Sequence, residues 1–484
     1  MIHDAISGKM SIKVAVAVLL IMAAGLIAYD VYAAMHIRKD AQVVLYDPGP
    51  LGQAAANDRV ITVDGKPVFT YATAVNFNRA WSQNPKTEKT PVAYFDFSGT
   101  VTVKVRTPGV KIEAVTIRPL SLGIKPVIKD DTLSFRLDKP AKLTIEINNN
   151  LHRAIHLFAN PIETDPPKEG DPDVVYFGPG IHDVGKIEVQ SNQTVYIAGG
   201  AVVHGFIKAT GLDNVKIIGR GIIDGSVYDR WKDGFVPIDL QKCTNCTVDG
   251  ITILDPAAWA LNVFTCENIT IDNVNIITAR SNGDGITTQS CRNLTASNCF
   301  VRGWDDNLVV KGYDGDVSGI TFDNIILWTD LAQSCEVGYE TRANIIEDVA
   351  FKNITVLHNF HKPVLSIHNS DQALVRNVSY SNIVVEDAQM GQGDGAGSNF
   401  LIDIMIAESQ WSQSETRGNV RDITYDNIKV LDGELPAIHF QGFDEEHTVE
   451  NVEITGLEVL GRKIGDIGSG KFYLGDFIKN IDVR

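Results

Sequence analysis

Three aspartates lie close together in the middle of the chain, in two short polar segments that are about one repeat apart. The first segment is Asn282-Gly283-Asp284-Gly285, and the second is Trp304-Asp305-Asp306-Asn307. Carboxyl groups that are held close together cannot all ionise freely, because each negative charge opposes the next. Hydrolysis of a glycosidic bond needs one protonated carboxyl as proton donor and one ionised carboxyl to activate water. The segments therefore predict an acid–base site, although Asp-Gly and Asp-Asp also occur in solvated turns.

The segments belong to a part of the chain that repeats itself. One phrase, with an Asn, Asp or Gly followed by alternating apolar residues and a polar corner, recurs from Asn245 to Asn451 at intervals of 23 to 29 residues, with one interval of 45. Repeats of this length are typical of solenoids, and each copy reads as strand, turn, strand. Asn at the corner tolerates left-handed backbone angles and can stack into a ladder of side-chain amides. We predict a right-handed, single-stranded parallel β-helix over residues 172–484; a leucine-rich repeat fits poorly because its leucines are missing.

Short alternating strands separated by turn residues precede the repeats. Examples are Val101 to Arg106 and Leu143 to Ile147, with Pro108-Gly109 among the turns. This pattern predicts an antiparallel β-sandwich over residues 42–163. The polar, proline-rich stretch from Glu163 to Pro172 is the expected linker. The predicted fold class is thus all-β, with an N-terminal antiparallel β-sandwich followed by the β-helix.

Residues 1–33 have the pattern of a signal peptide. Lys9 and Lys13 precede the apolar run from Val14 to Ala28, and Val31-Tyr32-Ala33 has the small residues of a cleavage site. An uncleaved signal anchor is the alternative, because the apolar run is near the lower limit for spanning a bilayer. In either case we expect an exported protein, secreted or periplasmic, that meets a membrane only if this segment is retained.

Charge and cysteine content limit the partners. The net charge of −17 disfavours nucleic acid and anionic membranes, which attract basic surfaces, and more weakly disfavours a polyanionic substrate. Cys243 and Cys246 resemble half a zinc site, but no second half follows at a suitable spacing. We expect no metal and no cofactor, the six cysteines in the core with one disulfide at most, and a monomer whose partner is a polysaccharide.

The two aspartate segments resemble motifs of a known family. Asn282-Gly283-Asp284, followed at an interval of 21 by Asp305-Asp306, is similar to the Asn-Thr-Asp and Asp-Asp elements of the polygalacturonase family of β-helix glycoside hydrolases. The strand-rich N-terminal part, ending in Ile155-His156-Leu157-Phe158-Ala159-Asn160-Pro161, resembles instead the N-terminal domain of the dextranase and isopullulanase family. Overall the chain most resembles this second, related family, which acts on neutral α-glucans.

The resemblance implies roles for the three aspartates. Asp305 would be the general acid, and Asp284 with Asp306 would orient and deprotonate water, which inverts the anomeric centre. Successive strand residues face opposite sides of a sheet, so Asp305 and Asp306 need a bulge or a turn if both are to reach the groove.

Departures from the polygalacturonase pattern bear on the substrate. That family's Gly-His-Gly is replaced by Ala332-Gln333-Ser334, and its Arg-Ile-Lys, which holds the uronate carboxylate, is replaced by Ser366-Ile367-His368. A site without these cations has lost the groups best suited to clamping a carboxylate. We therefore expect a neutral glycan such as dextran, unless Lys311 or Arg342 enters the groove from neighbouring coils.

Further candidates for substrate binding surround the acids. Each also has an ordinary structural interpretation, as a corner residue, surface charge or core side chain; they are Asn282, Trp304, Lys311, Glu336, Glu340 and His368. Aromatic rings can stack on the C–H faces of sugars, and Trp304 is the tryptophan nearest to the acids, with Trp231, Trp259, Trp328 and Trp411 as further candidates. The glycine-rich segment from Met390 to Ser398 is expected to be a loop, over the groove or in solvent.

Other functions are compatible with the same fold. They are a pectin-type hydrolase, a polysaccharide lyase that uses the aspartates to hold calcium, and a noncatalytic carbohydrate-binding β-helix. The last leaves the grouping of three acids without a purpose.

Overall fold

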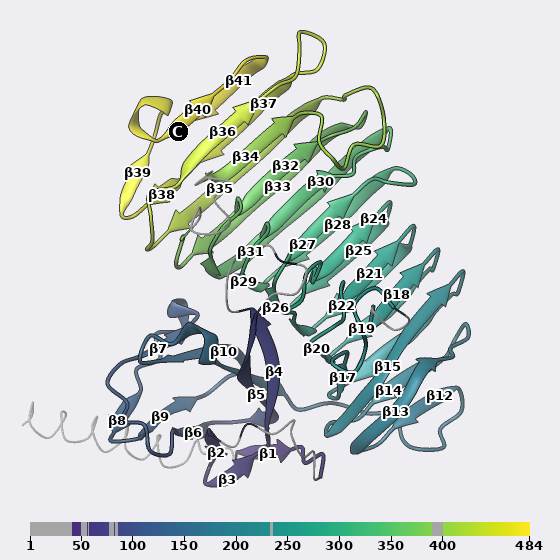
Figure 1. The fold of residues 1–484 in the computed structure, drawn as a ribbon, viewed down its shortest axis with the longest axis vertical. Helices are drawn as coiled ribbons and strands as arrows, with labels where there is room; N and C mark the ends of the chain where they lie inside the picture. The colour runs from purple at the N-terminus through teal and green to yellow at the C-terminus, as the bar shows by residue number, and fades with distance from the viewer. Residues whose placement is uncertain are drawn as a thin grey trace, which may run out of the picture.

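The computed structural model describes residues 41–49, 56, 58–76, 82, 86–232, 236–389 and 400–484. The expected signal segment and the glycine-rich loop at Met390 to Ser398 lie outside these residues. Two strand-rich bodies are visible: a stack of coils that rises to the C-terminus, and two smaller sheets that lie against its lower coils (Figure 1). The described residues include no helix long and apolar enough to cross a bilayer.

The N-terminal body is a sandwich of a six-stranded and a five-stranded sheet. The strands of the larger sheet are β1 (Gln42–Leu45), β4 (Thr70–Asn76), β5 (Thr87–Ser98), β7 (Val115–Arg118), β10 (Ala141–Ile147) and β11 (Ile155–Pro161). Those of the smaller sheet are β2 (Val60–Val63), β3 (Lys66–Val68), β6 (Val101–Arg106), β8 (Val127–Lys129) and β9 (Thr132–Leu137), and two 3-10 turns are η2 (Leu120–Leu122) and η3 (Leu151–Arg153). All pairings are antiparallel except β5 with β11, which is parallel. The predicted sandwich is present, with this one departure.

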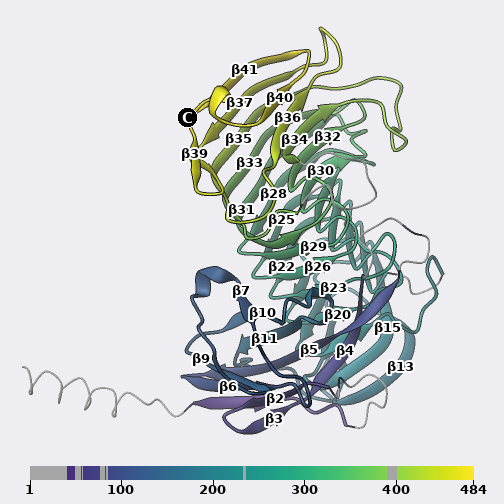
Figure 2. The same ribbon diagram turned by 60° about the vertical axis from the view of Figure 1, so that its left-hand side comes forward.

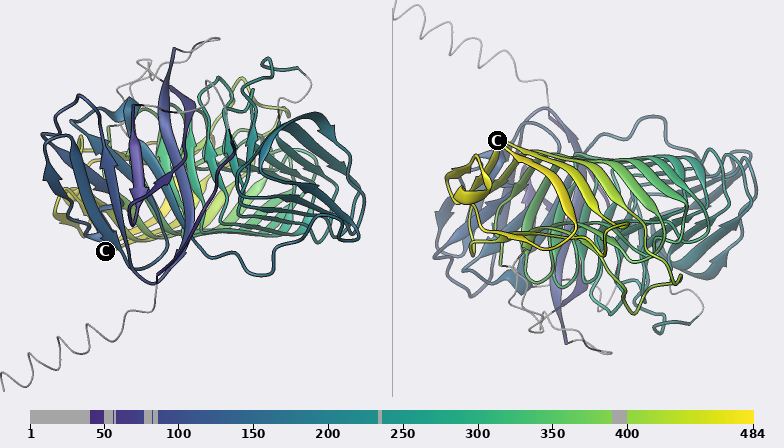
Figure 3. Two further views of the ribbon diagram at one scale, coloured as in Figure 1. Left: turned by 90° about the horizontal axis from the view of Figure 1, so that it is seen from below. Right: turned by 90° about the horizontal axis from the view of Figure 1, so that it is seen from above.

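The C-terminal body is a right-handed parallel β-helix, as predicted. Its strands stack in three rows, seen along the coils in Figure 3. The first row contains β12 (Val174–Phe177), β14 (Thr194–Ile197), β16 (Lys216–Gly219), β19 (Thr247–Asp249), β22 (Glu267–Asp272), β25 (Arg292–Ser297), β28 (Val317–Asp323), β37 (Val449–Thr455) and β41 (Ile478–Val483). The second row contains β17 (Ile222–Asp224), β20 (Thr252–Leu254), β23 (Asn275–Ile277), β26 (Phe300–Gly303), β29 (Ile326–Thr329) and β38 (Leu457–Val459).

The third row carries the candidate site. It contains β18 (Ile238–Gln241), β21 (Leu261–Phe264), β24 (Ile286–Gln289), β27 (Leu308–Lys311), β30 (Cys335–Tyr339), β32 (Leu365–Asn369), β34 (Phe400–Ile406), β36 (Ala437–Gln441) and β40 (Phe472–Leu474). Longer strands run through two rows: β13 (Gly180–Ile187), β15 (Ala201–Thr210), β31 (Ile345–Asn359), β33 (Leu374–Val385) and β35 (Val420–Val430). Near the C-terminus, β39 (Arg462–Ile464) pairs antiparallel with β38 and precedes the 3-10 turn η4 (Ile467–Ser469).

The corner asparagines explain why the coils stack in register. Asn298, Asn324, Asn353 and Asn382 have φ between 54° and 55°, a left-handed conformation that Asn tolerates because its side chain bonds locally. The amide of Asn324 donates to Asn298 at 2.7 Å, and that of Asn382 donates to Asn353 at 3.2 Å. The repeating corner of the sequence therefore forms the predicted ladder.

The interior of the coils is aliphatic and aromatic. Phe322, Phe351, Tyr380 and Tyr425 stack through four successive coils, with ring centroids 4.8–5.1 Å apart, which matches the spacing of paired strands. The six cysteines are all buried and unpaired. They are core residues, as expected, and the permitted disulfide is absent.

The sandwich and the coils share a buried apolar cluster. Tyr94 and Phe158 of the sandwich pack in it with Phe300 and Trp328 of the coils. Polar contacts border the cluster: Arg118 contacts Glu386 of the coils at 2.9 Å and Glu146 of its own sheet at 2.8 Å. In Figure 2 the two sheets lie directly beneath and beside the lower coils. No strand forms between Pro161 and Val174, where the sequence predicts the linker.

Candidate active site

The three aspartates lie in the turns that lead from the second row of strands to the third. Asp284 lies between β23 and β24, and Asp305 and Asp306 lie one coil further on, between β26 and β27. The acid pair is thus in a turn, which is one of the two arrangements that allow both side chains to reach the groove.

The two turns are bonded to each other through their backbones. The amide of Asp305 donates to the carbonyl of Gly283 at 3.1 Å, and the amide of Gly285 donates to the carbonyl of Asp306 at 2.8 Å. This close approach explains the glycines, because a Cβ on Gly285 would lie 2.4 Å from the carbonyl oxygen of Asn307. The sequence Asn-Gly-Asp-Gly therefore lets two acid turns stack in contact.

The buried side chain of Thr278 also connects the two turns by hydrogen bonds. The hydroxyl of Thr278 donates to the carbonyl of Gly283 at 2.6 Å and accepts from the amide of Trp304 at 2.8 Å. The sandwich also reaches this place, because Ser281 donates a hydrogen bond to the carbonyl of Ser82. The acid turns are consequently held on several sides.

The three carboxyl groups have raised pKa values. Burial and the charges of Asp305 and Asp306 hold the pKa of Asp284 well above its usual range. Burial, Asp305 and Glu336 raise the pKa of Asp306 to about 8. Burial raises the pKa of Asp305, while Lys311 and backbone hydrogen bonds oppose the rise. The three groups titrate as a set, and this set retains a proton at neutral pH.

Cations border the acids. Lys311 forms an ion pair with Glu340 at 2.8 Å and lowers the pKa values of all three aspartates. Lys362 has the same effect on Asp305. Arg230 donates to the carbonyl of Ser281 at 2.8 Å and to the side chain of Asn282. Lys311 therefore lies beside the acids, where it is paired with Glu340, whereas Arg342 pairs with Asp314 at 3.0 Å.

Further along the third row, acids and histidines of successive coils form a chain of contacts that is mostly buried. Nδ1 of His368 lies 2.8 Å from Oε1 of Glu336, and its Nε2 lies 3.2 Å from Oδ2 of Asp403. Asp403 also contacts Nδ1 of His439 at 2.8 Å, and Ser366 donates to Glu336. Glu336 and His368 are fully buried, so both are engaged with protein groups.

The expectation for Trp304 is wrong. Its side chain is 0 % exposed, because the acid turn folds it inward, and it cannot offer a face to a sugar. Trp328 is also core. Trp231 is 44 % exposed and packs edge-to-face on Trp259, with centroids 5.3 Å apart. Trp411 is 47 % exposed.

Several residues near the acids are not marked by any sequence motif. Asp403 and His439 occupy the register position of Ser366 on the next two coils, but the long interval before β34 interrupts the repeat count that would align them. Arg230 and Lys362 lie in turns of irregular length, where no repeating pattern marks them. No group of three or more His, Cys, Asp or Glu in the described ranges is arranged to hold a metal ion.

Comparison with known proteins identifies the family. Residues 178–465 match the glycosyl hydrolases family 28. The chain belongs to this family. The match covers the coils with all three aspartates, and the polygalacturonase resemblance of the two aspartate segments is thereby confirmed.

Individual relatives are distant. The chain is 23 % identical over 53 % of its length to a putative galacturan 1,4-alpha-galacturonidase A of Aspergillus niger. It is 24 % identical over 45 % of its length to a probable exopolygalacturonase B of Neosartorya fischeri. The matches span 64 % and 52 % of those proteins.

One solved structure resembles this chain over both the sandwich and the coils. Dex49A from Penicillium minioluteum aligns over 89 % of this chain and 96 % of its own, with a TM-score of 0.66 and 15 % identity. At this identity the likeness concerns the fold alone, but it extends over the sandwich as well as the coils. The expected architecture, a β-helix preceded by an N-terminal sandwich, is therefore confirmed.

Proposed function

We propose that this protein hydrolyses O-glycosidic bonds in a polysaccharide, with inversion at the anomeric carbon. The observation that carries the proposal is the stacking of two acid turns, which brings three carboxyl groups with raised pKa values to one edge of the third row. Membership of the glycosyl hydrolase family supports the same reaction.

Each aspartate has a role in the proposed reaction. In the reacting state the proton shared by the set lies on Asp305, which donates it to the leaving oxygen, while ionised Asp284 and Asp306 hold a water molecule on the opposite face of the sugar and remove its proton. Lys311 and Lys362 keep part of the set ionised, because both lower pKa values within it. A set that holds both a proton and a negative charge can supply acid and base together.

The proposed substrate is a neutral glycan, with an α-glucan such as dextran as the leading candidate. The positions that would hold a uronate carry Ser366 and His368, and both are hydrogen-bonded to Glu336. His368 also pairs with Asp403, so the charges at these buried positions are already compensated within the protein and no Arg or Lys stands there to hold a uronate. A polyanion would in addition approach against the net charge of −17.

Galacturonan is the second candidate. Three cations, Lys311, Lys362 and Arg230, act on the three aspartates, and a uronate next to the cleaved bond could interact with them. The names of the relatives from Aspergillus niger and Neosartorya fischeri point the same way.

One comparison separates these candidates. Purified protein is incubated with dextran, pullulan, polygalacturonate and an algal galactan under matched conditions, with reducing ends and ultraviolet absorbance recorded. Faster release of reducing ends from dextran or pullulan is expected. Faster cleavage of polygalacturonate would replace the neutral substrate by galacturonan, and an ultraviolet-absorbing product that depends on calcium would indicate a lyase.

The stereochemistry is tested separately. Proton NMR of the first-formed product should show the anomer opposite to that of the bond cleaved, and a retained anomer would contradict the roles given to Asp284 and Asp306. Glycan binding without product, unchanged in Asp305→Asn, would instead indicate a noncatalytic binding protein. Export of the chain is part of the proposal and rests on the signal pattern in residues 1–33.

A further inference from the structure

The turn between β34 and β35, residues 407–419, lies on the side of the third row opposite to the acid turns. It follows the third-row strand β34, whereas the aspartates precede β24 and β27. A groove over the third row would therefore run between the acid turns on one side and this turn on the other.

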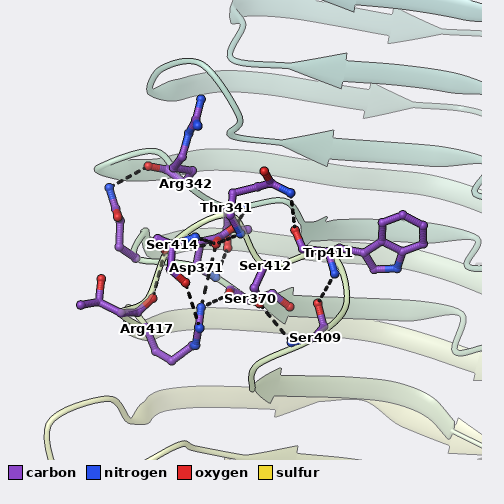
Figure 4. Close-up of polar contacts among 12 residues, drawn as sticks. Thr341, Arg342, Ser370, Asp371, Ser409, Trp411, Ser412, Ser414 and Arg417 are labelled. Atoms are coloured by element: carbon purple, nitrogen blue, oxygen red, sulfur yellow. Dashed lines mark hydrogen bonds and ion pairs between the residues drawn. The ribbon is translucent and has the colours of Figure 1, made fainter.

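A single buried carboxylate holds this turn in place. Oδ1 of Asp371 accepts from the backbone amides of Gln413 and Ser414, at 2.5 and 2.7 Å, and Oδ2 accepts from the amide of Thr341 at 3.0 Å. Asp371 is fully buried, and hydrogen bonds from amides to a buried carboxylate are strong. Figure 4 shows Asp371 at the centre of these contacts.

A second set of contacts closes the turn on both sides of its tip. The hydroxyl of Ser412 donates to the carbonyl of Ser370 at 2.7 Å. Arg417, which is itself buried, donates to the same carbonyl and to that of Ser414, the latter at 3.0 Å. Ser370 directly follows β32, so the turn folds back by one coil towards the aspartates.

Trp411 lies at the tip of this fixed turn. Its amide donates to the hydroxyl of Ser409 at 3.1 Å, and its carbonyl accepts from Nε2 of Gln413 at 3.1 Å. The indole is 47 % exposed and points away from Asp371 (Figure 4). The backbone around Trp411 is thus held by hydrogen bonds, while about half of the residue remains exposed.

The ring suits a sugar. An indole fixed by its backbone offers a broad apolar face with few rotatable bonds, and such a face packs on the C–H surface of a pyranose at little entropic cost. We propose that Trp411 is a stacking platform for a sugar unit of the bound polysaccharide, remote from the bond that is cleaved. This inference rests on the proposed polysaccharide hydrolase function.

Its position predicts dependence on chain length. The turn is tied to the coil of β32, which is two coils beyond the coil of Asp305 and Asp306 in the order β27, β30, β32. Two coils correspond to ~10 Å along the axis. If the sugar chain runs along the coils, one or two sugar units at the aspartates end before Trp411, and a polymer extends to it.

The experiment compares Trp411→Ala, Trp411→Phe and Trp231→Ala on the polymer that the wild type cleaves and on the shortest oligosaccharide of it that is still cleaved. Trp411→Ala should raise KM for the polymer by about 5- to 10-fold, with kcat within about twofold and the oligosaccharide unaffected. Trp411→Phe keeps an aromatic ring, so its KM for the polymer should be closer to that of the wild type than to that of Trp411→Ala. Trp231 lies beside Arg230, which contacts the acid turn, so Trp231→Ala should affect both substrates.

The alternatives are distinguishable. An unchanged KM for the polymer, or an equal change for both lengths, would overturn the platform while leaving hydrolysis intact. If the wild type cleaves none of the polysaccharides, the proposed function fails, and affinity electrophoresis in dextran and in polygalacturonate then tests the platform directly. Retardation lost in Trp411→Ala would support it, and no retardation of the wild type would reject it.

Discussion

Nδ1 of His368 lies 2.8 Å from Oε1 of Glu336, while Nε2 of the same ring lies 3.2 Å from Oδ2 of Asp403. Burial lowers the pKa of His368, but the two carboxylates outweigh burial and raise it to about 10. The imidazolium is therefore a buried counter-ion for Glu336 and Asp403, and its ring also stacks on Tyr339, with centroids 4.4 Å apart.

This ion pair makes stability depend on pH. A histidine whose pKa is about 10 when folded and about 6.5 when unfolded stabilises the fold fully below pH ~6.5, and this stabilisation is lost as the pH rises to ~10. The difference in unfolding free energy between wild type and His368→Gln should narrow over that window in denaturant titrations. Met405→Leu is the control, because Met405 pairs with His368 in the register and the substitution changes no ionisable group. The difference in unfolding free energy between wild type and Met405→Leu should therefore not vary with pH.

Asp305→Asn should lower kcat by about 10²- to 10⁴-fold, the usual contribution of a general acid. The unfolding free energy should stay within ~1 kcal/mol of wild type or rise, because the substitution removes a buried charge from a crowded set. Reducing-end assays and thermal unfolding measure the two effects. Asp314→Asn, at an exposed ion pair with Arg342, is the matched control and should be fully active.

Asp306→Asn should become more stable relative to wild type as the pH rises. Its carboxyl has a pKa of about 8 when folded and about 3.9 when unfolded, so the unfolded chain releases the proton earlier and wild-type stability falls between pH ~4 and ~8. The amide variant lacks this loss, which is at most ~1.4 kcal/mol per pH unit. A constant difference between pH 4 and pH 8 would show that this carboxyl ionises normally.

Lys311→Met should shift the pH profile of kcat/KM to higher pH by ~1 unit or more, because Lys311 lowers the pKa of Asp284, Asp305 and Asp306. Glu340→Gln should shift the pH profile in the opposite direction. Glu340 raises the pKa of Asp284, so its neutralisation should move the profile to lower pH. Shifts of the same sign in both variants would mean that the Lys311–Glu340 pair acts through structure rather than charge.

The coils could be predicted because each repeat contains the same alternating strand pattern within a short segment of sequence. The asparagine at each corner also favours a left-handed turn. The sequence also placed the three aspartates, since their spacing is that of one coil. Trp304 was misjudged because the direction of a side chain in a turn depends on how the turn packs, here through Thr278. Asp403 was missed because the long interval before β34 breaks the count that aligns it with Ser366.

The apolar cluster between the sandwich and the coils limits how the sandwich can be exchanged between related proteins. Val92 and Phe158 of the sandwich are buried in one cluster with side chains such as Phe300 and Leu357 from the coils. A sandwich transferred to the coils of another family member would face a surface that did not evolve with it. Exchange of parts between relatives would therefore have to carry both halves of this interface at once.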